Sequence, residues 1–265
     1  MPIPDEGYPR LAAVSPRVQV VATTDSTNAD VMGLAAGDPL GWPHLSLVLT
    51  DDQRAGRGRL DRSWTTPAGT ALAVSVVTRV PEVPSSARGW IPLAAGAAMT
   101  RAIARQLRGS GRTAALKWPN DVLLDGRKIS GILCETTADD PDMIVVGVGV
   151  NTRMTVGDLP VDTAVSFAAV GLEADDDRML ADFVAGLGER VAALGAARGD
   201  AVAAGVAGEV EAVCATLGRD VRVALPGGSA LEGRADRLDG DGRLVVIAPD
   251  GAVTAVSAGD VVHVR

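Results

Sequence analysis

Residues 53–64, QRAGRGRLDRSW, combine arginine and glycine at a spacing that suits the binding of an anion. The segment contains four arginines and two glycines: Arg54, Arg57, Arg59, Arg62, Gly56 and Gly58. A guanidinium group is a permanently charged fork of N–H donors that matches carboxylate and phosphate oxygens, and glycine lets the backbone approach a ligand closely. Taken alone, such a cluster is more often an exposed, solvated basic loop. The segments that follow it favour an anion-binding loop.

A second segment rich in reactive side chains covers residues 117–135, KWPNDVLLDGRKISGILCE, and shorter motifs are DSTN at 25–28 and GVGVN at 147–151. Alone, DSTN is more often a helix cap and GVGVN a strand end. Together and in this order, the motifs resemble the biotin–protein ligase family, whose hallmarks are a GRGR-x-x-R-x-W loop and a KWPNDV segment followed by GRK-x-x-GIL. A C-terminal stretch from about Asp220 to Arg265 resembles the small β-barrel of that family. The resemblance therefore covers nearly the whole chain.

The resemblance implies a two-step reaction that uses biotin, ATP and Mg²⁺. Such enzymes activate the biotin carboxylate as biotinyl-5′-adenylate, release pyrophosphate, and pass biotin to a lysine of the biotin carboxyl carrier protein of acetyl-CoA or related carboxylases. Because both reactants are anionic, cations must offset their repulsion and stabilise the charge that develops on phosphorus. Mg²⁺ is implied because it screens the triphosphate. No dedicated protein metal site is expected, although Asp121 or Asn120 is a weak candidate to touch the ion.

Residues of this chain match the family's site residues position by position. The matching catalytic positions are Lys128, Arg59 and Lys117. Those matching the biotin-binding positions are Ser26, Thr27, Asn28, Gln53, Arg57, Gly58, Arg59, Lys128 and Gly131. Those matching the nucleotide-binding positions are Arg57, Arg59, Trp64, Lys117 and Asn151.

The resemblance also gives several of these residues individual roles. Lys128 is expected to bridge the biotin carboxylate and the α-phosphate, and Lys117 to support the phosphates. Gly131 would let the ring system lie against backbone, and Trp64 would cover the adenine. The chain departs from the family at Asp61, where glycine is common, which affects the charge and flexibility of the loop but not its liganding positions.

The order of elements predicts an α+β fold. Strands are expected at residues 18–22, 45–50, 70–77, 116–118, 122–124, 128–135 and 143–150, with a hairpin turn at Asp125-Gly126. Helices are expected from the polar cluster 23–28 through Ala36, over 86–107 with Pro92 in the first turn, and twice within 176–217. Strands joined by hairpins favour a mostly antiparallel mixed sheet with packed helices, in the class II synthetase-like form of biotin ligase catalytic domains. We expect this domain over residues 1–217 and an SH3-like β-barrel over 218–265, where apolar and polar residues alternate between turns.

Composition narrows the function classes. Lys and Arg number 25 and Asp and Glu 33, so the net charge of −8 argues against a general nucleic-acid binder and makes the arginine loop a local exception. Cys134 and Cys214 have no zinc or disulfide spacing and are interpreted as reduced structural thiols. No segment has the roughly 20 apolar residues that would span a bilayer, and no signal peptide is evident, so a cytoplasmic protein is expected.

Three alternatives to biotin ligation remain. A lipoate or octanoate ligase or transferase of the same superfamily would share the fold, although the GRGR and KWPND motifs favour biotin. A DNA-binding regulator is disfavoured by the charge and by the short stretch before the first strand, which is far too short for a winged helix-turn-helix, so a ligase that is not a repressor is expected. A noncatalytic binding module built on the C-terminal barrel would bind ligand without releasing pyrophosphate. A weak or ligand-dependent homodimer is compatible with the sequence.

Overall fold

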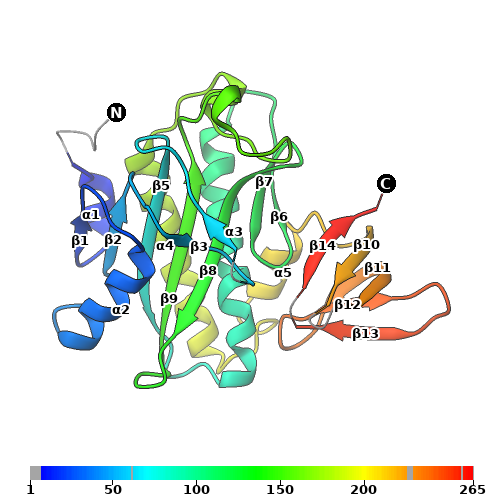
Figure 1. The fold of residues 1–265 in the computed structure, drawn as a ribbon. Helices are drawn as coiled ribbons and strands as arrows, with labels where there is room; N and C mark the ends of the chain where they lie inside the picture. Colours follow the sequence, from blue (N-terminus) through cyan, green and yellow to red (C-terminus); the bar gives the residue numbers. More distant parts are fainter. Residues whose placement is uncertain (1–6, 61, 226–228, 258, 265) are drawn as a thin grey trace.

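A seven-stranded mixed sheet forms the centre of the larger unit in the computed structural model, which describes residues 7–60, 62–225, 229–257 and 259–264 (Figure 1). The strands follow the order β1 (Val18–Val20), β2 (Leu47–Thr50), β5 (Ala71–Arg79), β9 (Met143–Asn151), β8 (Arg127–Thr136), β7 (Asp121–Leu124) and β6 (Ala114–Lys117). Only β1 and β2 pair in parallel; all other neighbours are antiparallel. The predicted mostly antiparallel mixed sheet is confirmed.

Helices cover the two faces of this sheet unequally. The long helices α3 (Trp90–Gln106) and α4 (Asp176–Ala196) lie behind the sheet in Figure 1, and the shorter α5 (Val206–Glu211) follows α4. Among the helices that the structure describes, α2 (Thr27–Gly37) covers the opposite face, where it packs over one end of the sheet through Val31 and Ala35 against Val48 and Val145. The rest of that face is left for the loop that contains the arginines.

Local sequence signals explain the ends of several elements. The Ser26 side chain accepts the backbone N–H of Ala29 at the start of α2, which confirms the predicted helix cap. Asp125 and Gly126, which join β7 to β8, have φ values of 48° and 80°, as a two-residue hairpin requires. Two features were not predicted: the N-terminal helix α1 (Pro9–Val14), and a small hairpin of β3 (Gly56–Arg57) and β4 (Ser63–Trp64) within the arginine loop.

A smaller sheet forms the C-terminal unit, at the right in Figure 1. Its antiparallel strands, in spatial order, are β13 (Val253–Val256), β12 (Leu244–Ile247), β11 (Ala230–Leu238), β10 (Asp220–Ala224) and β14 (Asp260–His263). Short alternating strands are what the sequence predicted. Within the described residues β13 and β14 are the edges of this sheet and do not pair with each other.

The C-terminal unit is attached to the larger one by two buried tryptophans. Trp90 Nε1 donates to the Gly240 carbonyl at 2.8 Å, and Trp118 Nε1 donates to the Gly242 carbonyl at 3.3 Å. Gly242 has a φ of 78° and lies close to the Gly89 backbone, so a side chain there would be strained. Trp118 is 2% exposed and is therefore a packing residue. None of the helices in the described part of the chain combines the length and apolarity that a membrane span needs.

Candidate active site

The floor of the site is a row of small residues on the face that α2 shares. Ala73 pairs in register with Gly149, and Gly149 pairs with Gly131. The row continues with Asp121 on β7 and Lys117 on β6. Paired residues direct their side chains to the same face of a sheet. This face therefore carries the small residues Ala73, Gly149 and Gly131, and next to them the charged residues Asp121 and Lys117. A flat ligand can therefore lie on the sheet with its anionic end toward Lys117 and toward Lys128, which pairs with Asp121.

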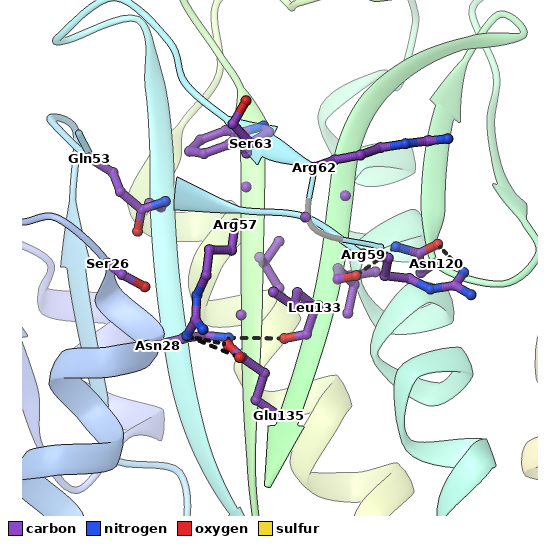
Figure 2. A pocket seen from close by; sticks show the side chains of 18 of the residues that line it. Ser26, Asn28, Gln53, Arg57, Arg59, Arg62, Ser63, Asn120, Leu133 and Glu135 are labelled. Atoms are coloured by element: carbon purple, nitrogen blue, oxygen red, sulfur yellow. Dashed lines mark hydrogen bonds and ion pairs between the residues drawn. The ribbon is translucent and has the colours of Figure 1, made fainter. Parts of the chain in front are cut away.

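The arginine loop forms the roof over this floor (Figure 2). The Trp64 indole lies against Gly149, where an added Cβ would come within 2.6 Å of its ring, so this contact needs glycine. Roof and floor enclose a cavity of about 160 Å³. Ten of the sequence-predicted site residues line it: Ser26, Thr27, Asn28, Gln53, Arg57, Gly58, Arg59, Trp64, Lys128 and Gly131.

One end of the cavity is polar and nearly closed to solvent. Gln53 Oε1 accepts the backbone N–H of Thr27 at 2.9 Å, and Thr27 Oγ1 lies 3.1 Å from the same oxygen. Ser75, on β5, places its hydroxyl 2.7 Å from Thr27 Oγ1 and within hydrogen-bond distance of Asn28 Oδ1. These side chains are at least nine-tenths buried. Such an arrangement suits a ligand with its own amide-like donors and acceptors, since an unpaired partner would be costly to bury.

Glu135 closes this polar end and was missed by sequence reasoning. Its carboxylate accepts from Asn28 Nδ2 at 2.7 Å and pairs with the Arg57 guanidinium at 3.0 Å. Figure 2 shows the three side chains converging from α2, the loop and β8. A signal was present in the sequence: Glu135 alternates with Gly131 and Leu133 along β8, which places a carboxylate on the face of the glycine.

The other end of the cavity is cationic. Lys128 Nζ lies 2.5 Å from Asp121 Oδ1, and the Arg62 guanidinium pairs with Asp260 of the C-terminal unit. Arg59 is different, because its Nη1 donates to the neutral Oδ1 of Asn120 at 3.0 Å. Burial lowers the pKa of Arg59, while the nearby carboxylates of Asp260 and Asp121 raise it.

These pairings distinguish Arg59 from the other cations that line the cavity. Four cations line the cavity, Arg57, Arg59, Arg62 and Lys128, and in the described part of the chain only Arg59 lacks a carboxylate within 4.0 Å. A carboxylate or phosphate at this end would supply the missing charge.

Two predicted site residues lie beside the cavity rather than in its lining. Lys117 is on the floor side, one strand beyond Asp121. It also contributes to a lowered pKa at His263, for which burial is the larger cause. Asn151 is buried on the same face as Gly149, and its Nδ2 donates to the Val165 carbonyl at 3.0 Å. Asp61 lies outside the described residues.

A second cavity, of about 470 Å³, adjoins the first. It shares Arg59, Asn120, Ile132 and Leu133 with the first cavity and lies between the two units, where Gly242 also lines it. The cationic end is thus open toward the junction of the units. Both cysteines are free, and the described residues contain no group of three or more His, Cys, Asp or Glu side chains that could hold a metal ion.

Comparison with known proteins identifies relatives of both units. The profile of the Biotin/lipoate A/B protein ligase family matches residues 20–151, and that of the Biotin protein ligase C terminal domain matches residues 216–264. The biotin–[acetyl-CoA-carboxylase] ligase of Mycobacterium tuberculosis is 38% identical over 251 residues, which cover 94% of this chain and 90% of that protein. The enzyme of the same name from Paracoccus denitrificans is 40% identical over 135 residues, covering 50% of this chain and 53% of that protein.

A solved structure has the same fold. The biotin protein ligase from Aquifex aeolicus in complex with biotin and ATP matches with a TM-score of 0.75, covering 94% of this chain and 99% of that one. At 22% sequence identity, this likeness concerns the arrangement of elements.

Proposed function

This chain belongs to the biotin protein ligase family, and we propose that it is an ATP-dependent biotin–[biotin carboxyl-carrier protein] ligase. It activates biotin as biotinyl-5′-AMP and transfers biotin to a lysine of the carrier protein of acetyl-CoA carboxylase or a related carboxylase. Its substrates are biotin, ATP with Mg²⁺, and the carrier.

The observation that carries the proposal is the asymmetry of the cavity. A buried polar end fits the neutral ureido ring of biotin, the row of small residues fits the flat bicycle, and the cationic end fits the carboxylate and the α-phosphate. Arg59 supplies a cation that is not already paired with a carboxylate. Binding two anions there offsets their mutual repulsion, which would otherwise oppose their approach.

In the first step a biotin carboxylate oxygen attacks the α-phosphorus of ATP, and the bond to pyrophosphate breaks. Lys128 exchanges its Asp121 partner for the two reacting anions and stabilises the negative charge that grows on the phosphoryl oxygens. Arg59 and Lys117 assist with their positive charges, and Mg²⁺ brought by ATP would screen the charge of the pyrophosphate. In the second step the neutral lysine amine of the carrier attacks the acyl carbon, AMP leaves, and an amide forms.

Further parts of the proposal concern how the chain is organised. Residues 1–217 form the catalytic domain and 218–265 the C-terminal domain. The biotin contacts come from the ten cavity residues other than Trp64, and the nucleotide contacts from Arg57, Arg59, Trp64, Lys117 and Asn151. The protein acts in the cytoplasm, where ATP and carrier proteins meet, without binding nucleic acid, and any homodimer is weak or depends on ligand.

The test is a two-stage assay of the full-length protein. Purified protein is incubated with biotin, ATP and Mg²⁺, pyrophosphate is measured, and a biotin carboxyl carrier domain is then added and analysed for a mass gain on its lysine. Parallel reactions contain lipoate or octanoate in place of biotin, and one contains EDTA. We expect pyrophosphate and carrier labelling with biotin only, and neither with EDTA. Release of pyrophosphate with lipoate or octanoate but not with biotin would refute the proposal, as would ligand binding without pyrophosphate release.

A further inference from the structure

Four buried polar side chains lie at the polar end of the cavity, the ring end, where the biotin ring is proposed to bind. They belong to a hydrogen-bonded chain that ends at Glu135. Gln53 Oε1 accepts the backbone N–H of Thr27, and from the Thr27 hydroxyl the chain runs through Ser75 and Asn28 to the carboxylate. Ser75 is fully buried and Thr27, Asn28 and Gln53 are 3%, 6% and 9% exposed. Because no water replaces a lost partner there, the donors and acceptors must match along the whole chain.

Two acceptors on β8 fix the direction of this chain. The Glu135 carboxylate and the Leu133 carbonyl only accept, at 2.7 and 3.3 Å from Asn28 Nδ2, so Asn28 presents Nδ2 to them and Oδ1 to Ser75. An amide oxygen cannot donate, so the Ser75 hydroxyl gives its one proton to Asn28. Ser75 is then left to accept from Thr27 Oγ1, 2.7 Å away.

The same carboxylate holds the loop. Arg57 Nη2 lies 3.0 Å from Oε1 and 3.2 Å from Oε2 of Glu135, and the Glu135 side chain is only 22% exposed. Arg57 lies on β3, the strand that pairs with β4, and β4 carries Trp64. Glu135 thus connects the polar wall at α2 to the roof of the cavity.

We propose that Glu135 is a positioning residue for biotin: together with the Leu133 carbonyl it sets the donor–acceptor direction from Asn28 to Thr27, and it holds Arg57 over the ring. This inference rests on the proposed function. It differs from the roles of Lys128 and Arg59, because Glu135 acts on the binding of the ring and contacts neither of the two reacting groups. Loss of such an interaction removes binding that is equal in the ground state and the transition state, so it raises KM and leaves kcat unchanged.

Glu135→Gln is the informative substitution. Glutamine keeps the shape but is uncharged. When its oxygen accepts from Asn28, its NH2 group takes the place of the carboxylate oxygen that lies 3.0 Å from Arg57 Nη2, so two donors face each other and the ion pair is lost. Hydrogen bonds to charged groups contribute about 1.5–3 kcal/mol, so the KM for biotin should rise roughly tenfold or more. The kcat for pyrophosphate release should stay within about threefold of the wild type, and the KM for ATP should rise less than the KM for biotin, because Arg57 also contacts the nucleotide in the proposed function.

Two further variants keep the test decisive. Ser75→Ala interrupts the same chain at its centre, and it should also raise the KM for biotin selectively. Because both changes break one chain, the double variant should be less impaired than the product of the two single effects. Glu209→Gln is the matched control: it makes the same substitution at a carboxylate that pairs with Arg190, between α4 and α5, and should leave all constants unchanged.

The experiment measures biotin- and ATP-dependent pyrophosphate release for the full-length variants, with circular dichroism to establish folding. A wild-type protein that releases no pyrophosphate with biotin would contradict the proposed function itself. With an active wild type, the inference is overturned if folded Glu135→Gln keeps its KM for biotin within twofold, or loses kcat instead. If Glu135→Gln does not fold, Ser75→Ala alone decides: an unchanged KM for biotin overturns the inference, and a selective rise supports it.

Discussion

Lys128→Ala should abolish most of the adenylation activity, and the structure gives a reason beyond the loss of one cation. In the wild type the Lys128 ammonium lies 2.5 Å from Asp121 Oδ1. Removing the ammonium leaves the Asp121 carboxylate facing the place where a carboxylate and a phosphate must meet. Loss of one preorganised stabilising group in an active site costs roughly 10²–10³ in kcat. Repulsion between two charges about 6 Å apart adds up to about 3 kcal/mol at an effective dielectric constant near 20.

Both side chains are partly exposed, at 43% and 23%, so solvent screens this repulsion, and we expect roughly tenfold from it. Lys128→Ala should therefore lose at least about 10²-fold in pyrophosphate release, and the double variant with Asp121→Asn should recover about tenfold of that loss. The assay is biotin-dependent ATP–pyrophosphate exchange with folded proteins. Near wild-type exchange by Lys128→Ala would refute the role of the lysine. A double variant worse than Lys128→Ala would refute the repulsion argument.

Four other changes give separate outcomes. Arg59→Gly should release biotinyl-adenylate faster than it loses adenylation, so that albumin added to the reaction becomes labelled at least about tenfold above wild type; labelling confined to the carrier domain would contradict this. Truncation after Leu217 removes the acceptors of two buried tryptophans and should impair carrier biotinylation more than biotin binding, as measured by calorimetry beside the carrier assay. Gly149→Ala should displace the Trp64 indole and raise the KM for biotin roughly tenfold or more, and an unchanged value would place the indole elsewhere. Burial lowers the pKa of His44 from its usual 6.5. The neutral imidazole therefore makes its full contribution to the free energy of unfolding above that pH, and this contribution is lost as the pH falls. Urea midpoints measured from pH 5 to 7 should vary less in His44→Asn than in the wild type.

The sequence was sufficient where local pattern and chemistry coincide. The period-two alternation of GVGVN puts Gly147 and Gly149 on one face, and the polar cluster before α2 caps that helix. Asp125-Gly126 has the residue types of a two-residue turn, so β7 and β8 were placed as a hairpin. Elements defined by such short-range rules were predicted within a few residues of their ends.

Features that depend on contacts between distant segments could not be predicted in the same way. The short pairing of β3 with β4 has no periodicity of its own, because two residues a strand are too few to show one. The helix α1 is held by Asp177, whose carboxylate accepts from the backbone N–H groups of Arg10 and Leu11, 166 or more residues away. The local sequence of neither segment predicts this contact.

Glu135 lies between these two cases and shows what a site needs besides its reactive groups. Its place on the cavity face follows from alternation along β8, but its partners come from α2 and from the loop, so only the folded chain brings Asn28 and Arg57 to one carboxylate. Gly147 completes the argument, since an added Cβ there would lie 2.2 Å from Asn28 Oδ1. A glycine on β9 and a carboxylate on β8 thus leave Asn28 one position and one orientation. The end of the cavity proposed for the biotin ring is therefore ordered before a ligand binds. Binding then loses little side-chain conformational entropy there, which favours affinity.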